Sequence, residues 1–199
     1  MKSLVKICGI TNENDALIAA EMGAHALGFV FYGRSKRYVS FEKAREIISR
    51  LPTFLVKVGV FVGETWERMM EVREFCKLDR IQFYGVDAGW QSQIVPEIAI
   101  MGYRVRDKGD VRAAKESPVF PLLDSYTETL YGGTGKQFDW NLLADFGRPC
   151  IVAGGINAGN IDEVLKLNPY AIDIASGVES TPGVKDPDKM AEIFDKLKG

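Results

Sequence analysis

Short apolar, β-rich runs alternate with longer amphipathic runs along the whole chain, and this alternation limits the possible folds more than any other feature. Eight strand–helix pairs can be counted. The predicted strands are residues 4–8, 26–30, 54–60, 79–83, 103–106, 119–124, 150–153 and 171–175. The predicted helices are residues 12–22, 41–50, 65–76, 88–96, 111–114, 141–145, 157–167 and 187–198. The fifth and sixth helices are short, so the pattern is weakest in the middle of the chain.

Eight such pairs, joined by right-handed crossovers, close most simply into an α/β fold, a single-domain (β/α)8 TIM barrel spanning residues 1–199. This length is near the lower limit for a TIM barrel. The alternative is a doubly wound open sheet, which normally has fewer strands and a GxGxxG turn after the first one. Here the first predicted strand runs into the segment ICGIT, which favours the barrel.

The charge balance excludes several classes of partner. The chain has a formal net charge of -2, with 46% hydrophobic and 26% charged residues. No positive excess is present to hold nucleic acid or an anionic membrane, so an anionic ligand has to be held by local groups. No apolar stretch approaches the roughly 20 residues needed to cross a bilayer, and the N-terminus lacks the apolar run of a signal peptide. We therefore expect a cytoplasmic protein, monomer or homodimer, that binds neither nucleic acid nor a membrane.

Cysteine and histidine usage argues against a metal site. Cys8, Cys76 and Cys150 are an odd number of cysteines at scattered spacing, with no CxxC pair and no set of histidines. We expect neither a disulfide scaffold nor a bound metal. His25, the only histidine, precedes the second predicted strand, at the end of a barrel remote from a ligand site. Histidine general-base catalysis is therefore excluded.

Cys8 ends the first predicted strand and is followed at once by Gly9. In a barrel, ligands bind at the carboxyl ends of the strands, so Cys8 would face the mouth of the site. Strand alternation puts Lys6 on the same face, and a cation beside a thiol favours the thiolate. The alternative is that Cys8 is simply a small buried apolar residue.

Asp124 ends an apolar run that begins at Phe120. A buried carboxylate is costly unless it is paired or faces a site, and alternation points Asp124 into the barrel. The alternative is an aspartate that caps a helix or turn. We favour a role in the site.

Glycines and a loop of cations provide candidate anion-binding groups. Gly154 and Gly155 close the seventh predicted strand, and Ser176 and Gly177 close the eighth, where many barrels bind phosphate. The alternative is that glycine serves the tight turns alone. Arg37 lies in a loop with two other cations. It could offer its guanidinium to a carboxylate, although such a run is often only a solvated surface.

The chain also resembles a known family. The strings are VKICGIT, GRSKRYVS, VGVFV, IQFYG, LLDS, YGGTGKQFDW, VAGGIN and DIASGVESTPGVKD. In this order they are similar to phosphoribosylanthranilate isomerase of tryptophan biosynthesis. The resemblance implies a (β/α)8 enzyme that converts N-(5-phosphoribosyl)anthranilate into 1-(2-carboxyphenylamino)-1-deoxyribulose 5-phosphate by an Amadori rearrangement. It implies a small phosphorylated substrate and no metal or organic cofactor.

The resemblance also implies residue roles. Cys8 matches the general base, Asp124 the general acid, and Arg37 the residue that holds the anthranilate carboxylate. The remaining substrate-binding residues that it implies are Gln82, Gly133, Gly154, Gly155, Ser176 and Gly177. Two departures are visible: family members usually carry Leu-His where this chain has Phe83-Tyr84, and commonly proline at Lys36.

The chemistry sets demands on the two reacting groups. A general acid at Asp124 needs a raised pKa, which its apolar strand favours, whereas Cys8 needs only a modest lowering, which Lys6 could supply. A histidine-pathway isomerase on the same scaffold would use paired aspartates and show a twofold repeat, and neither is found here. A phosphate-binding module without catalysis would not need both Cys8 and Asp124.

Overall fold

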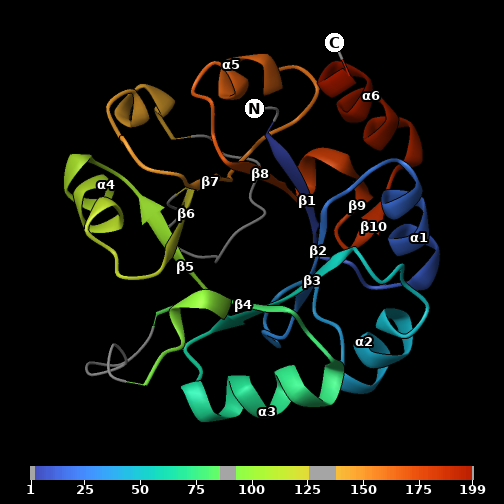
Figure 1. Ribbon diagram of the computed structural model, residues 1–199. Coiled ribbons are helices and arrows are strands. Elements are labelled where there is room, and N and C mark those ends of the chain that lie inside the picture. The colour runs from blue at the N-terminus through green and yellow to red at the C-terminus, as the bar shows by residue number, and fades with distance from the viewer. Residues whose placement is uncertain (1–2, 86–92, 126–137, 199) are drawn as a thin grey trace.

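The computed structural model describes residues 3–85, 93–125 and 138–198. Eight parallel strands form a closed barrel, in chain order from β1 to β8, with the helices around it (Figure 1). The strands are β1 (Leu4–Cys8), β2 (Ala26–Val30), β3 (Val56–Val62), β4 (Arg80–Tyr84), β5 (Ala99–Val105), β6 (Phe120–Ser125), β7 (Ile151–Val152) and β8 (Ala171–Ile174). The predicted (β/α)8 barrel is confirmed, and the open sheet is excluded because β1 pairs with both β2 and β8.

The outer layer departs from the prediction in the middle of the chain. Its α-helices are α1 (Glu13–Glu21), α2 (Phe41–Ile48), α3 (Trp66–Cys76), α4 (Lys108–Lys115), α5 (Ile161–Leu165) and α6 (Pro187–Lys198). Single 3-10 turns are η2 (Pro96–Ile98), η3 (Trp140–Leu143) and η4 (Ser176–Val178). The helix predicted at 88–96 lies partly outside the described residues, and its described end forms only η2. The helix predicted at 141–145 is η3, a single turn that ends at Leu143, ahead of Gly147, a residue with φ of 73°.

Two strand assignments are corrected. β5 begins at Ala99, four residues before the predicted start at residue 103. Gly102 interrupts the apolar run, which led to the late predicted start, but residues before Gly102 pair with both β4 and β6. A short antiparallel hairpin, β9 (Glu179–Thr181) and β10 (Val184–Lys185), follows β8 and was not predicted. The hairpin brings polar residues back toward the carboxyl ends of the barrel strands.

Strand alternation divides the core into two layers. Val5 and Ile7 point outward into the layer between barrel and helices. Cys8 belongs to a separate cluster inside the barrel, with Val58, Leu122 and other inward-facing residues. The lumen is therefore packed with side chains, as in other barrels of this size. Among the described residues, no helix has the length and apolar character required to span a membrane.

Gly28 on β2 makes room for two polar groups inside the barrel. A Cβ built on it would lie 2.7 Å from the Cys8 Sγ and 3.1 Å from the Lys6 Nζ. Both groups therefore occupy the lumen because the neighbouring strand has no side chain at this level.

Replacing this glycine should destabilise the barrel. We expect Gly28→Ala to lower the free energy of unfolding by about 1–3 kcal/mol in urea titrations, because overpacking a closed core displaces its neighbours. Gly33→Ala is the control: among the described residues, no atom lies within 4 Å of its built Cβ, so we expect a change within about 0.5 kcal/mol. Equal effects of the two substitutions would contradict the packing argument.

Candidate active site

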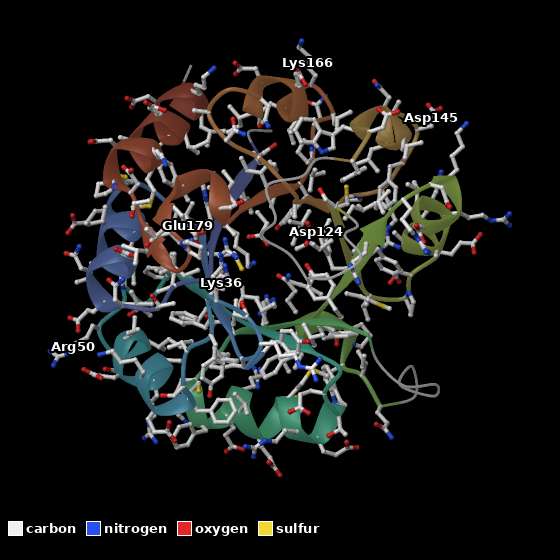
Figure 2. All side chains as sticks on the ribbon, turned by 180° about the vertical axis from the view of Figure 1, so that it is seen from behind. Lys36, Arg50, Asp124, Asp145, Lys166 and Glu179 are labelled. Atoms are coloured by element: carbon white, nitrogen blue, oxygen red, sulfur yellow. The ribbon has the colours of Figure 1, made fainter. Side chains whose placement is uncertain are left out.

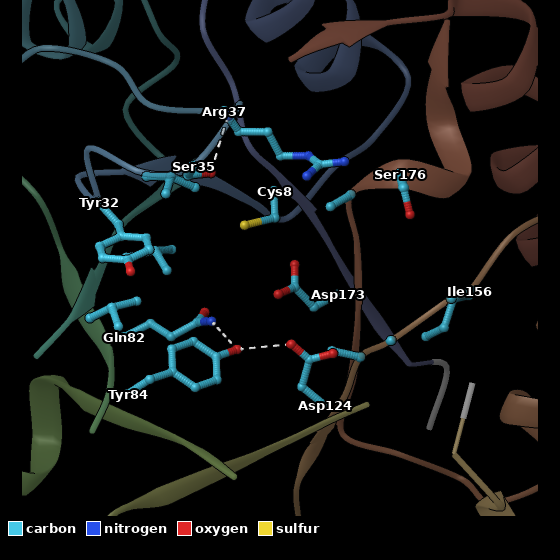
Figure 3. A pocket seen from close by; sticks show the side chains of 17 residues that line it. Cys8, Tyr32, Ser35, Arg37, Gln82, Tyr84, Asp124, Ile156, Asp173 and Ser176 are labelled. Atoms are coloured by element: carbon cyan, nitrogen blue, oxygen red, sulfur yellow. Dashed lines mark hydrogen bonds between the residues drawn. The ribbon is translucent and has the colours of Figure 1, made fainter. Parts of the chain in front are cut away.

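A pocket opens at the carboxyl ends of the barrel strands and collects most of the predicted site residues (Figure 3). Figure 2 views the molecule from the side opposite to Figure 1, and Asp124 lies there over the centre of the ring of helices. The predicted residues that line the pocket are Cys8, Arg37, Gln82, Asp124, Gly154, Gly155 and Ser176. Gly133 lies outside the described residues. Gly177 does not line the pocket but packs the loop after β8 against the loop after β7.

A buried ion pair lies beneath the two proposed reacting groups. Lys6 on β1 and Asp173 on β8 are register partners, and their Nζ and Oδ2 atoms are 2.8 Å apart. They are 3% and 7% exposed, respectively. The Asp173 Oδ1 is buried and has no hydrogen-bond partner among the described residues, and Asp173 lines the pocket. Asp173 is not among the predicted site residues, although an aspartate inside the apolar run of β8 is a signal of the same kind as Asp124.

The Cys8 thiol lies in the lumen and is buried. Burial raises the pKa of the Cys8 thiol, and the charge of Asp173 adds to this effect, while Lys6 and Lys185 lower it. The net direction is upward, so the expectation that the Cys8 pKa is lowered is wrong. The physical reason is burial, the largest effect on the thiol, which outweighs the lowering by Lys6.

Asp124 is the penultimate residue of β6 and is almost fully buried. Burial raises the pKa of its carboxyl group to about 6, and Asp173 pushes in the same direction. Its Oδ1 accepts a hydrogen bond from the Ser125 N–H at 2.7 Å, and its Oδ2 accepts one from the Tyr84 hydroxyl at 3.3 Å. The expected upward shift of the Asp124 pKa is confirmed. A group with this pKa is partly protonated near neutral pH and can serve as a general acid.

Arg37 is held by a carboxylate within the protein. Its Nε and Nη2 donate to the Glu179 Oε1 and Oε2 at 2.8 and 2.6 Å, which is a bidentate pair. Gly9 has φ of 80°, and a Cβ there would lie 2.5 Å from the Arg37 Cδ, so this glycine lets the side chain cross the end of β1. Arg34 and Lys36 are exposed, as expected of a solvated run. Arg37 differs from them because Glu179 fixes its guanidinium beside the pocket.

Glu179 is in turn held by Lys185, which is fully buried. The Lys185 Nζ donates to the Glu179 Oε1 at 2.9 Å and to the backbone oxygen of Cys8 at 2.6 Å. Burial would raise the pKa of Glu179, but Arg37 and Lys185 keep it below its ordinary value. Neither Glu179 nor Lys185 was predicted as a site residue, because their pairing joins the hairpin β9–β10 to loops far away in the chain.

The loop after β7 is fixed by asparagines. The side-chain amides of Asn157 and Asn160 both donate to the backbone oxygen of Gly155, at 3.1 and 2.9 Å. Gly154 and Gly155 have φ of 90° and 67°, a region that favours glycine. A Cβ on Gly154 would overlap the Ser125 side chain, so this loop lies directly against the end of β6. The glycines are therefore required by backbone geometry, and they also border the pocket.

Two other polar residues lie away from the pocket. Asp107 is exposed and begins α4, where its Oδ1 accepts from the Gly109 N–H at 2.7 Å. His25 lies at the amino end of the barrel, and its Nδ1 accepts from the Val5 N–H at 3.2 Å, which confirms a structural role. Within the described residues, no group of three or more histidine, cysteine, aspartate or glutamate side chains could hold a metal ion.

Comparison with known proteins gives one consistent family. A family model for N-(5'-phosphoribosyl)anthranilate (PRA) isomerase matches residues 5–196. The N-(5'-phosphoribosyl)anthranilate isomerase of Thermotoga neapolitana is 41% identical over 201 residues, covering 98% of each chain. The crystal structure of phosphoribosyl anthranilate isomerase from Thermotoga maritima is similar with a TM-score of 0.87 and 39% identity, covering 99% of each chain. A phosphoribosyl anthranilate isomerase in complex with reduced 1-(o-carboxyphenylamino)-1-deoxyribulose 5-phosphate has a TM-score of 0.84 and 36% identity, covering 99% of each chain.

Breaking the Glu179 pair should destabilise the protein. We expect Glu179→Gln to lower the free energy of unfolding at pH 7 by about 3 kcal/mol or more, because it leaves the Arg37 and Lys185 cations with a neutral partner. Urea titration measures this change. Glu46→Gln, in an exposed pair with Lys43 3.0 Å away, is the control, with an expected loss below about 1 kcal/mol. A small loss in Glu179→Gln would mean that water or another group satisfies the two cations.

Proposed function

The chain belongs to the N-(5'-phosphoribosyl)anthranilate isomerase family, and on that premise we propose that its barrel mouth isomerises N-(5'-phosphoribosyl)anthranilate. The product is 1-(2-carboxyphenylamino)-1-deoxyribulose 5-phosphate, an intermediate of tryptophan biosynthesis. The observation that carries the proposal is that an acid with a pKa of about 6 and a cysteine line one pocket. A relative in this family was crystallised with a reduced form of this product.

In the proposed first step, the protonated carboxyl of Asp124 gives its proton to the ribose ring oxygen. The carbon–oxygen bond at C1 breaks with its electron pair going to oxygen, the nitrogen lone pair forms the C1=N double bond, and the glycosylamine opens to a protonated Schiff base. Asp124 is left ionised. The raised pKa of Asp124 supports this role because it allows a protonated fraction near neutral pH.

In the second step, the Cys8 thiolate removes the proton from C2 of the ribose. The electron pair of the C–H bond forms the C1–C2 double bond, and the Schiff base nitrogen becomes an amine. The resulting enolamine then takes a proton at C1 and loses one from its C2 hydroxyl, which gives the ketone. Cys8 ends the cycle protonated and Asp124 ionised, so exchange with water restores the starting forms.

Groups at both ends of the pocket suit the two anionic ends of this substrate. We propose that the loops bearing Gly154, Gly155, Ser176 and Gly177 hold the phosphate, supported by the position of three of them in the pocket lining. We propose that Arg37 meets the anthranilate carboxylate. Since Glu179 takes the bidentate edge through Nε and Nη2, the carboxylate would be met by another N–H of the guanidinium. Gln82 lines the pocket from the wall formed by β4.

Turnover of fresh substrate tests the proposal directly. N-(5'-phosphoribosyl)anthranilate loses its fluorescence on conversion, and we expect wild type to convert it. Cys8→Ala and Asp124→Asn should each lower kcat by about 100-fold or more with little change in KM, because proton-transfer groups act mainly in the transition state. A near-normal kcat in either variant would remove that residue from its role, and an inactive wild type would overturn the proposal.

The pH profile should carry the signature of this acid and base. The reacting form needs Asp124 protonated and Cys8 ionised, although the pKa of Asp124 lies below that of Cys8. This form has lost one proton in total, so kcat/KM should rise with pH through about 6, level off, and fall above the raised pKa of Cys8.

Asp124→Asn distinguishes a titration of the enzyme from a titration of the substrate in the pH profile of kcat/KM. Only Cys8 has to be ionised in this variant, so the rise near pH 6 and the alkaline fall should both disappear, and residual kcat/KM should instead increase through the raised pKa of Cys8. The phosphate of the substrate also titrates near 6. A rise that persists unchanged in Asp124→Asn would therefore belong to the substrate.

A further inference from the structure

Tyr84, the last residue of β4, contacts the proposed acid from across the barrel wall. Its side chain is 5% exposed and lines the pocket. The Gln82 Nε2 donates to the Tyr84 hydroxyl at 3.1 Å, and this hydroxyl donates to the Asp124 Oδ2 at 3.3 Å (Figure 3). The second distance is longer than a typical O–H···O hydrogen bond, as is common in unliganded active sites. Tyr84 is also one of the two departures from the family pattern.

Gly102 on β5 lets Tyr84 reach Asp124. β5 lies between β4 and β6, so a side chain from β4 has to pass over it to contact β6. A Cβ on Gly102 would overlap the Tyr84 ring at the Cε1 and Cζ atoms. The ring therefore lies directly on the backbone of β5, and the absence of a side chain at residue 102 gives it the room to do so.

We propose that Tyr84 is a positioning residue for the general acid, with Gln82 holding its hydroxyl and Gly102 seating its ring, an inference that rests on the proposed role of Asp124. The Asp124 carboxyl is then held at both oxygens, by the Ser125 N–H and by the Tyr84 hydroxyl. Holding both oxygens fixes the rotation of the carboxyl group. One orientation toward the ribose ring oxygen is thereby selected.

The groups around Asp124 show in which direction the Tyr84 hydrogen bond shifts the pKa of the carboxyl group. Burial is the largest effect and raises the pKa of Asp124. Asp173 on β8 also raises this pKa, whereas Tyr84 on β4 and Lys6 on β1 lower it. On β5 the register partner of Asp124 is Arg104. Burial raises the pKa of Tyr84 well above its ordinary value, so its hydroxyl keeps its proton and remains a donor. Removing this donor should therefore raise the pKa of Asp124.

The first test is Tyr84→Phe, which keeps the ring and removes the hydroxyl. We expect the pKa of Asp124, followed by the 13C shift of its carboxyl carbon and assigned with Asp124→Asn, to move up by about half to one pH unit. The acidic limb of kcat/KM should move by the same amount. We also expect kcat to fall about 3- to 10-fold at constant KM, through the loss of carboxyl orientation.

Tyr103→Phe is the matched control. Tyr103 belongs to β5 but packs in the outer layer against the helices. The same loss of one hydroxyl there should leave the Asp124 titration and kcat unchanged. An Asp124 titration that is unchanged in Tyr84→Phe, or equally shifted in Tyr103→Phe, would overturn the proposal.

Gly102→Ala tests the seat of the ring without touching the hydroxyl. It should displace Tyr84 and reproduce the titration shift of Tyr84→Phe. In the double variant the two shifts should not add, because both remove one contact. Additive shifts would show that Gly102 acts independently of Tyr84 and would overturn its part of the proposal.

The NMR titration separates this inference from the proposed function. If the Asp124 pKa moves in Tyr84→Phe and the kinetic limb does not follow, the contact between Tyr84 and Asp124 holds and Asp124 is not the acid. If the pKa does not move, the positioning role fails whatever Asp124 does. Both results can be obtained with folded protein, which urea titration of each variant verifies.

Discussion

The buried ion pair between Lys6 and Asp173 is the interaction on which the chemistry of this barrel depends. Each charge would be costly to bury alone, and each is the other's partner across the β1–β8 seam. The pair also sets the electrostatics above it. Burial raises the pKa of the Cys8 thiol, and within the pair Lys6 lowers this pKa more than Asp173 raises it. On Asp124 the order is reversed, because Asp173 raises its pKa more than Lys6 lowers it. The pair thus favours the ionised base and the protonated acid, although burial keeps the Cys8 pKa above its ordinary value.

A second buried network holds the mouth of the barrel. Lys185 donates to the Glu179 carboxylate and to the backbone oxygens of Cys8 and Ala175. The Glu179 carboxylate in turn orients Arg37. The loops after β1, β2 and β8 are therefore joined through two buried side chains from the hairpin β9–β10. This network explains why a short hairpin absent from a minimal barrel contributes to the site.

The barrel and the positions of Cys8 and Asp124 could be predicted from the sequence. Both residues end apolar predicted strands, where burying a polar side chain is costly unless it has a partner or faces a site. The sequence was not sufficient for the pKa of Cys8, since the upward effect of burial outweighs that of Lys6 and arises only when the barrel closes around the thiol. Glu179 and Lys185 carry no local signal, because each is an ordinary charged residue until the hairpin folds back. In the sequence, Tyr84 resembles an ordinary apolar strand residue. Its contact with Asp124 depends on the absence of a side chain at Gly102 on the neighbouring strand, which only the structure shows. The helix predicted after β6 failed locally, because the chain turns at Gly147 after a single 3-10 turn.

The pairing of β1 with β8 has a consequence for how the protein is made. Lys6 emerges from the ribosome before its partner Asp173, which follows 167 residues later. At typical rates of about 5–20 residues per second, this separation corresponds to roughly 10–30 s of synthesis. Throughout this interval the nascent chain carries an ammonium group that cannot be buried favourably, so a half-barrel gains little by closing around it. Closure of the lumen around Lys6 is therefore favoured only after the strand that carries Asp173 has been translated.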